Sequence, residues 1–175
     1  MREIKFGNYL QNNQIAEPIE WIVLEEKDNK CLLTTKYGID AQVYHTSDGN
    51  IAWKDSYIRN WLNNEFYNSA FSSAEKMHID DIILAENCND KVFLLSRNET
   101  SKYFLSINSN KIMATPYTRS KGIDVGQSGW VSYWLRDTGY CIDDTWGTIG
   151  ASIYGSDGYM LSIKFAIRPA IWITL

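Results

Sequence analysis

The chain opens with two segments in which apolar and polar side chains alternate. Residues 3–9 and 20–26 show this alternation, and the polar stretch 27–30 joins the second segment to the apolar run 31–35. Alternation with a period of two is typical of a half-buried strand. A short polar turn between two such segments indicates a hairpin. The pattern therefore predicts an edge strand followed by a β-hairpin.

The apolar period lengthens in the middle of the chain. Apolar side chains recur one helical turn apart at Ile58, Trp61, Leu62 and Phe66, which predicts an amphipathic helix that ends near Asn68. Asp55 or Ser56 precedes it, where a side-chain oxygen can accept the free N–H groups of the first turn.

Two further pairs of residues have the spacing of a helix capping box. Ser72 is followed by Glu75, and Ser96 by Glu99, so that each serine and its glutamate can satisfy each other's backbone N–H groups. These pairs predict short helices through residue 79 and to about residue 104. The apolar run 92–95 between them predicts a short buried strand.

Glycines divide the last 60 residues into short segments of high β propensity. The segments 130–135, 149–154, 160–165 and 170–173 are aromatic or β-branched, and the glycines between them mark loops. Strands at both ends around a helical middle favour an α+β fold. At 175 residues the chain has the length of one domain, and we expect a single domain over residues 1–175.

Composition and charge narrow the function classes. The chain is 45% hydrophobic and 22% charged, which is typical of a globular protein. Its net charge is −4 and no run of Lys or Arg can follow a phosphate backbone, so we expect no nucleic-acid partner. There is no apolar targeting segment at the N-terminus and no run of 18 apolar residues. These features predict a protein without a membrane partner that is cytoplasmic or is exported by a route that leaves no signal.

Residues suited to metal binding or nucleophilic catalysis are widely spaced. The cysteines Cys31, Cys88 and Cys141 are odd in number and far apart, which favours reduced thiols. His45 and His78 are not spaced as zinc ligands. The acidic residues of the C-terminal loops lack the alternating spacing of a calcium loop, and we interpret them as solvated turn residues. We therefore expect no metal, no cofactor and no catalytic residue.

The high aromatic content points to recognition instead. Aromatic residues make up 14% of the chain, and several lie in or beside the C-terminal loops. Large amphipathic rings on loops are typical of sugar or protein recognition. Arg136 and Arg168 lie in apolar surroundings, and we expect loop carbonyls or carboxylates to anchor them. The candidate ligand-binding residues are Trp130, Tyr133, Tyr140, Asp143, Trp146 and Tyr154.

Several segments, taken together, resemble a known family. They are Phe6-Gly7-Asn8-Tyr9, residues 18–24, 56–63 and 90–96, Trp134-Leu135-Arg136, and Arg168-Pro169-Ala170-Ile171-Trp172-Ile173. With these segments the chain resembles a bacterial domain family of unknown function related to the C-type-lectin-like and formylglycine-generating (sulfatase-modifying factor) proteins. The resemblance implies paired N- and C-terminal strands, central helices on one side and long glycine-rich loops on the other.

The residues that carry activity in these relatives are incomplete here. The resemblance implies a cysteine pair that holds copper near the C-terminal end, but only Cys141 lies in that half. The carbohydrate motifs of calcium-dependent lectins are also missing. We therefore expect a non-enzymatic module that recognises a protein or carbohydrate ligand through its C-terminal loops. The alternatives are a degenerate formylglycine-generating-type oxidoreductase, which requires a second thiol near Cys141, and a phage-like assembly component. The oligomeric state stays open.

Overall fold

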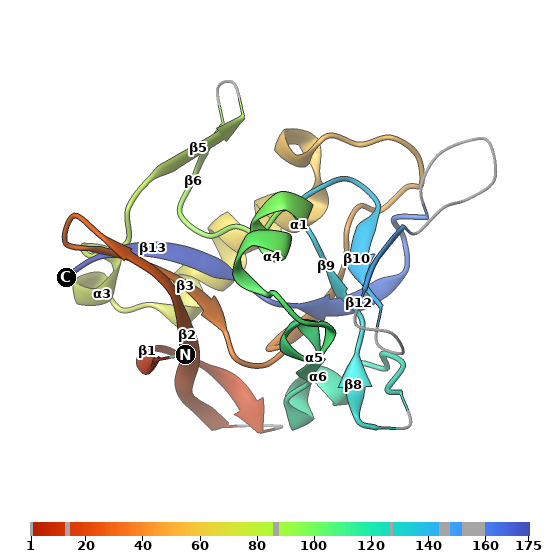
Figure 1. Ribbon diagram of the computed structural model, residues 1–175, viewed down its shortest axis with the longest axis horizontal. Coiled ribbons are helices and arrows are strands. Elements are labelled where there is room, and N and C mark those ends of the chain that lie inside the picture. The colour runs from red at the N-terminus through yellow and green to blue at the C-terminus, as the bar shows by residue number, and fades with distance from the viewer. Residues whose placement is uncertain (1, 13–14, 86–87, 127, 144–147, 152–159) are drawn as a thin grey trace.

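A four-stranded antiparallel sheet joins the two ends of the chain (Figure 1). The computed structural model describes residues 2–12, 15–85, 88–126, 128–143, 148–151 and 160–175. The strands are β1 (Glu3–Asn12), β2 (Ile15–Lys27), β3 (Lys30–Thr35) and β13 (Ala170–Thr174), in the order β1-β2-β3-β13. The predicted edge strand and hairpin are confirmed. Asp28 and Asn29 form the two-residue turn with φ of 51° and 61°, the left-handed conformation that tight hairpins need.

The pairing of the terminal strands corrects one expectation. β13 pairs with β3, and β1 pairs only with β2, so the two terminal strands lie at opposite edges of the sheet. The physical reason is the short turn after β2, which forces β3 to pair with β2 and leaves the far edge of β3 open for the last strand.

A second sheet of five short strands combines four strands of the C-terminal half with β4 from the N-terminal half. These are β4 (Asp40–Val43), β9 (Tyr133–Trp134), β10 (Tyr140–Ile142), β11 (Ile149–Ala151) and β12 (Lys164–Ile167), in the order β11-β10-β9-β12-β4. Two small antiparallel pairs complete the strands: the hairpin of β5 (Ile82–Ala85) with β6 (Cys88–Asp90), and the pair of β7 (Ile112–Met113) with β8 (Trp130–Val131).

The helices are short and lie in the middle of the chain. After the single turn η1 (Trp53–Asp55), Ser56 caps a continuous helical stretch made of α1 (Tyr57–Trp61), η2 (Leu62–Phe66) and α2 (Tyr67–Ala70). Both predicted capping boxes are present, at α3 (Ser73–Lys76) and α4 (Arg97–Tyr103). α5 (Ile107–Asn110) and α6 (Pro116–Ser120) had no prediction. The structure is therefore a single-domain α+β fold, with mostly strands and a few short helices.

The main core lies where the four-stranded sheet meets the helices. All four periodic apolar residues of the first helix are buried, at no more than 3% exposure. Residues 92–95 are also buried, but they are not the strand that their apolar run predicts, because only Phe93 pairs with β13, through one isolated bridge to Ala170. Among the described residues, no helix has the length and apolar character needed to cross a membrane.

Candidate functional site

A hollow of about 600 Å³ lies where the start of α4, the loop before β10 and the β5–β6 hairpin come together. We call it the Arg97 hollow. Its lining combines aromatic, basic and hydroxyl side chains with a small apolar part: Ala52, Trp53, Leu84, Ser96, Arg97, Asn98, Arg136, Asp137, Thr138 and Tyr140.

Arg97 is the most exposed basic side chain of this hollow. Its guanidinium carbon lies 3.9 Å from the centre of the Tyr140 ring, a cation–π contact. Asp137 also holds Arg97, because its carboxylate accepts the Arg97 backbone N–H at 2.6 Å and lies 3.6 Å from Nε. Within the described chain, neither Nη atom of Arg97 has a hydrogen-bond acceptor, and the side chain is 45% exposed. The guanidinium group is thus held in place with its outer donors toward solvent.

Arg136 has an anchoring role beside it. Its Nη1 donates to the Leu94 carbonyl at 3.0 Å, and its Nη2 lies 2.9 Å from the Glu99 carboxylate. The backbone N–H of Arg136 also donates to the Leu95 carbonyl at 2.9 Å. These contacts fasten the loop before β10 to the start of α4, so Arg97 and Tyr140 are held against each other. The predicted anchoring of Arg136 is confirmed.

A buried carboxylate holds the hairpin wall of the hollow. Asp90 on β6 is fully buried, and it accepts Arg59 Nε at 2.6 Å and Trp53 Nε1 at 2.8 Å. The Cys88 thiol also lies 3.5 Å from Asp90 Oδ2. Because Trp53 and Leu84 line the hollow and Asp90 ends the hairpin that carries Leu84, this network ties two parts of the lining together.

The structure brings one of the six predicted ligand-binding residues, Tyr140, into the hollow. Asp143 is half-buried just after β10, and Trp130 is half-buried on β8, away from the hollow lining. Trp146 and Tyr154 lie outside the described residues.

Tyr133 lies in the interior, at 3% exposure. Its hydroxyl donates to the Asn110 carbonyl at 2.9 Å and accepts from Arg168 Nη1 at 3.0 Å. Burial raises the pKa of Tyr133, while the Arg168 cation opposes that shift. Arg168 also donates Nε to the Thr35 carbonyl at 3.0 Å. Its predicted anchoring to a carbonyl is therefore confirmed, but this carbonyl ends strand β3 and does not belong to a loop. Both side chains therefore hold elements together, and Tyr133 presents no free ring.

Sequence reasoning missed Arg97 and Asn98 altogether. The capping box at Ser96 and Glu99 is the one signal that locates them, since it places Arg97 in the first turn of a helix. Asp137 belongs to the acidic C-terminal loops, but no local sequence signal shows that it pairs with Arg97, because tertiary packing brings the two residues together.

The cysteines are distributed over three separate sheets. Cys31 lies on β3, Cys88 on β6 and Cys141 on β10, and all three are buried thiols that form no disulfide in the described chain. Burial raises the pKa of the Cys88 thiol, and the Asp90 carboxylate adds to the shift. Within the part of the chain that the structure describes, no cluster of three or more His, Cys, Asp or Glu side chains is arranged to hold a metal ion.

Comparison with known proteins gives a family but no function. Neither the curated proteins nor the solved structures contain a match to the sequence. The model of a family described as "Domain of unknown function (DUF6273)" matches residues 28–175, which include the Arg97 hollow and every strand from β3 onward. The chain therefore belongs to the DUF6273 family.

Proposed function

We propose that this domain is a non-enzymatic recognition module that holds a protein partner at the Arg97 hollow. The observation that carries the proposal is the Arg97 guanidinium, laid on the Tyr140 ring with both Nη atoms free of acceptors in the described chain. A planar guanidinium fixed in this way offers two parallel donors to a carboxylate or a main-chain carbonyl. Because Arg97 is already oriented, binding costs less side-chain entropy.

The lining of the hollow supports a protein rather than a sugar at this position. Arg, Tyr and Trp side chains are enriched where protein interfaces gain most of their binding energy, and Arg97, Tyr140 and Trp53 all line the hollow. A sugar ring stacks on an open aromatic face, but Arg97 already covers one face of Tyr140. Asp143, Trp130, Trp146 and Tyr154 stay candidates for a wider contact surface.

The C-type-lectin-like resemblance of the C-terminal segments agrees with this proposal. Recognition residues lie disproportionately on loops that a rigid scaffold carries, and Asp137 and Thr138 lie on such a loop between β9 and β10. Fold alone does not give function, so the proposal rests on the side chains of the hollow. The redox alternative requires a second thiol near Cys141. The three cysteines lie on three separate sheets, and that placement gives this alternative no support.

Comparative capture from a lysate of the source organism tests the proposal. Wild-type protein, Arg97→Ala and Arg2→Ala are immobilised at equal density, and the retained proteins are quantified by mass spectrometry. Arg2 is the matched control because it is an exposed arginine, 52% accessible, in an exposed ion pair with Glu26. We expect at least one protein that wild type and Arg2→Ala retain and Arg97→Ala loses. Identical sets of proteins on all three columns contradict the proposal.

A further inference from the structure

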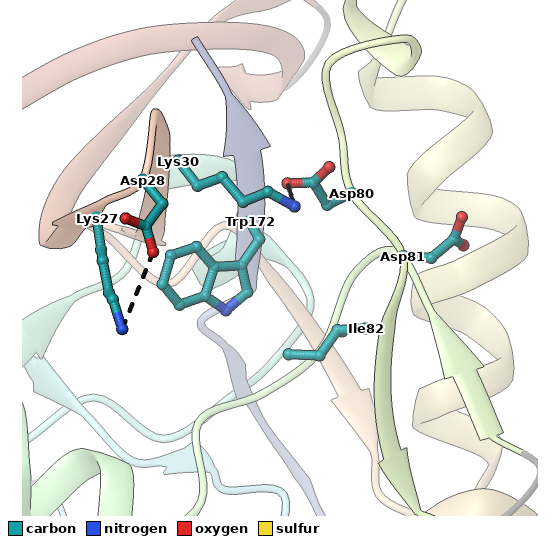
Figure 2. Close-up of a pocket in the computed structure, with 7 residues that line it drawn as sticks. All are labelled: Lys27, Asp28, Lys30, Asp80, Asp81, Ile82 and Trp172. Atoms are coloured by element: carbon teal, nitrogen blue, oxygen red, sulfur yellow. Dashed lines mark ion pairs between the residues drawn. The ribbon is translucent and has the colours of Figure 1, made fainter.

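A second pocket, of about 340 Å³, opens between the β2–β3 turn, β13 and the start of β5 (Figure 2). It shares no residue with the Arg97 hollow. Its lining places one aromatic ring among acidic and basic side chains, with a single aliphatic neighbour: Lys27, Asp28, Lys30, Asp80, Asp81, Ile82 and Trp172. We call it the Trp172 pocket.

Trp172 differs from the four tryptophans of the described core, each of which contacts another aromatic ring; Trp61, for example, stacks on Phe66. Trp21, Trp53 and Trp134 each donate the indole N–H to an acceptor and each contact another aromatic ring. Trp172 is half-buried on β13, and in the described chain its indole has no ring partner, no cation above it and no acceptor for Nε1. Figure 2 shows the ring between the Lys27 and Asp28 side chains on one side and Lys30, Asp80 and Ile82 on the other. An aromatic face and one N–H donor are thus available to a ligand.

The charges around the indole are close to balance. Lys30 Nζ lies 3.1 Å from Asp80 Oδ2, and Lys27 Nζ lies 3.9 Å from Asp28 Oδ2. Asp81 has its own partner, Lys91, at 2.9 Å. The rim therefore offers donors and acceptors side by side with little net charge, which suits hydroxyl groups better than a strongly charged ligand.

Backbone and side-chain bonds hold these groups in place. Two hydrogen bonds hold the β2–β3 turn to Leu175. Asn29 Nδ2 donates to the Leu175 carbonyl at 2.7 Å, and the Leu175 N–H donates to the Asn29 carbonyl at 2.9 Å. The Asp80 carboxylate accepts the Thr174 hydroxyl at 3.1 Å, and the Asp80 N–H donates to the Trp172 carbonyl at 2.9 Å. A ligand meets walls that are already ordered, which lowers the entropic cost of binding.

We propose that the Trp172 pocket binds a neutral pyranose ring of a carbohydrate. The apolar C–H face of the sugar stacks on the indole, and its hydroxyls bond to Trp172 Nε1, to the Lys30 ammonium and to the Asp80 carboxylate. The pocket volume lies at the small end of the range for ligand sites, which suits one or two sugar rings. A nucleotide base also stacks on indole, but both lysines of the lining already pair with carboxylates, Lys27 with Asp28 and Lys30 with Asp80, so the lining offers its phosphates no unpaired cation. This site is additional to the protein-recognition surface and does not depend on it.

Titration of the whole chain with single methyl glycosides tests the inference. The methyl glycosides of glucose, galactose, mannose and N-acetylglucosamine are each added up to about 20 mM, and binding is measured by saturation-transfer NMR and tryptophan fluorescence. We expect one or more to bind wild type with a dissociation constant near 1 mM, a typical weak affinity of about −4 kcal/mol. Saturation transfer should be strongest at the sugar C–H protons that face the indole.

Substitutions in the Trp172 pocket show whether the glycoside binds there or elsewhere on the protein. Trp172→Ala should weaken binding at least about tenfold, and Lys30→Ala should weaken it severalfold while leaving the sheet intact, since Lys30 points from the strand end with 48% of its side chain exposed. Arg97→Ala should leave glycoside binding unchanged, so this test is independent of the proposed protein site. The inference is overturned if no glycoside binds wild type, if both pocket variants bind as wild type does, or if adenosine monophosphate binds more tightly than every glycoside.

Discussion

Asp90 is the side chain on which the hairpin wall of the Arg97 hollow depends, and its removal has a calculable cost. Asp90→Ala leaves three donors without their acceptor: the indole N–H of Trp53, which is 7% exposed, the Nε of Arg59, whose side chain is 24% exposed, and the weakly donating thiol of Cys88. A hydrogen bond to a charged group contributes about 1.5 to 3 kcal/mol. Arg59 recovers part of its loss from water, whereas Trp53 recovers little. We expect a loss of about 3 to 4 kcal/mol, within the range for breaking a buried ion pair.

The assays are urea unfolding, which gives the free energy of unfolding, and thermal unfolding, which gives Tm; both are followed by tryptophan fluorescence. In a chain of this size each kcal/mol lowers Tm by about 2 to 4 °C, so Asp90→Ala should melt about 10 °C below wild type. Asp81→Ala is the matched control, because Asp81 pairs with Lys91 close to the same hairpin and its side chain is 54% exposed. An exposed pair contributes less than about 1 kcal/mol. A loss below about 1 kcal/mol for Asp90→Ala would refute the reasoning.

Three other predictions concern stability and thiol chemistry. Gly7→Ala should lower the free energy of unfolding by more than Gly122→Ala. Both glycines have positive φ, +70° and +77°, but only at Gly7 does an added Cβ meet the Phe71 ring, at 2.7 Å. Equal losses of the two variants in urea unfolding would contradict this. Burial alone raises the pKa of Glu75, but hydrogen bonds from Ser72 and Gly7 outweigh it and hold that pKa below its usual range. Glu75 therefore adds stability that is present above about pH 4.3 and is lost as pH falls through the lowered pKa. In Glu75→Gln the urea midpoint should fall less between pH 7 and pH 3 than it does in wild type. An equal fall of the urea midpoint in both proteins counts against the prediction. All three buried thiols should resist iodoacetamide in the native protein at pH 8 and react after unfolding, and rapid native labelling of any cysteine, measured by intact mass, contradicts their burial.

Much of the local structure follows from the sequence. The alternation before and after the 27–30 turn gives the hairpin, and the two Ser-to-Glu capping boxes mark where α3 and α4 begin. These signals depend on contacts between residues a few positions apart, so they hold regardless of how the rest of the chain packs. The buried run 92–95 is different, because an apolar stretch has the same composition whether it pairs as a strand or crosses the core with one bridge.

The candidate site was harder to predict because its members come from separate segments. Tyr140 has the side chain of a recognition residue, but nothing near it in sequence shows that Arg97 covers its ring. Tyr133 has the same chemistry, but it lies on β9, an interior strand of the five-stranded sheet, and packs in a buried apolar cluster, where its hydroxyl accepts a hydrogen bond from Arg168. Trp172 appears in sequence as a core residue of an apolar strand, whereas its position on the sheet edge beside the β2–β3 turn leaves its ring on a pocket.

Photo-crosslinking from the rim of the Arg97 hollow tests the central claim most directly. A photoreactive phenylalanine derivative replaces Asn98, an exposed residue of the lining, and in a second protein it replaces Lys5, an exposed residue of β1. Both proteins are irradiated in a lysate of the source organism, with and without the Arg97→Ala substitution. The account predicts a discrete crosslinked protein from position 98 that is missing from position 5 and disappears with Arg97→Ala. The same crosslinks from both positions, or crosslinks from position 98 that persist without Arg97, contradict it.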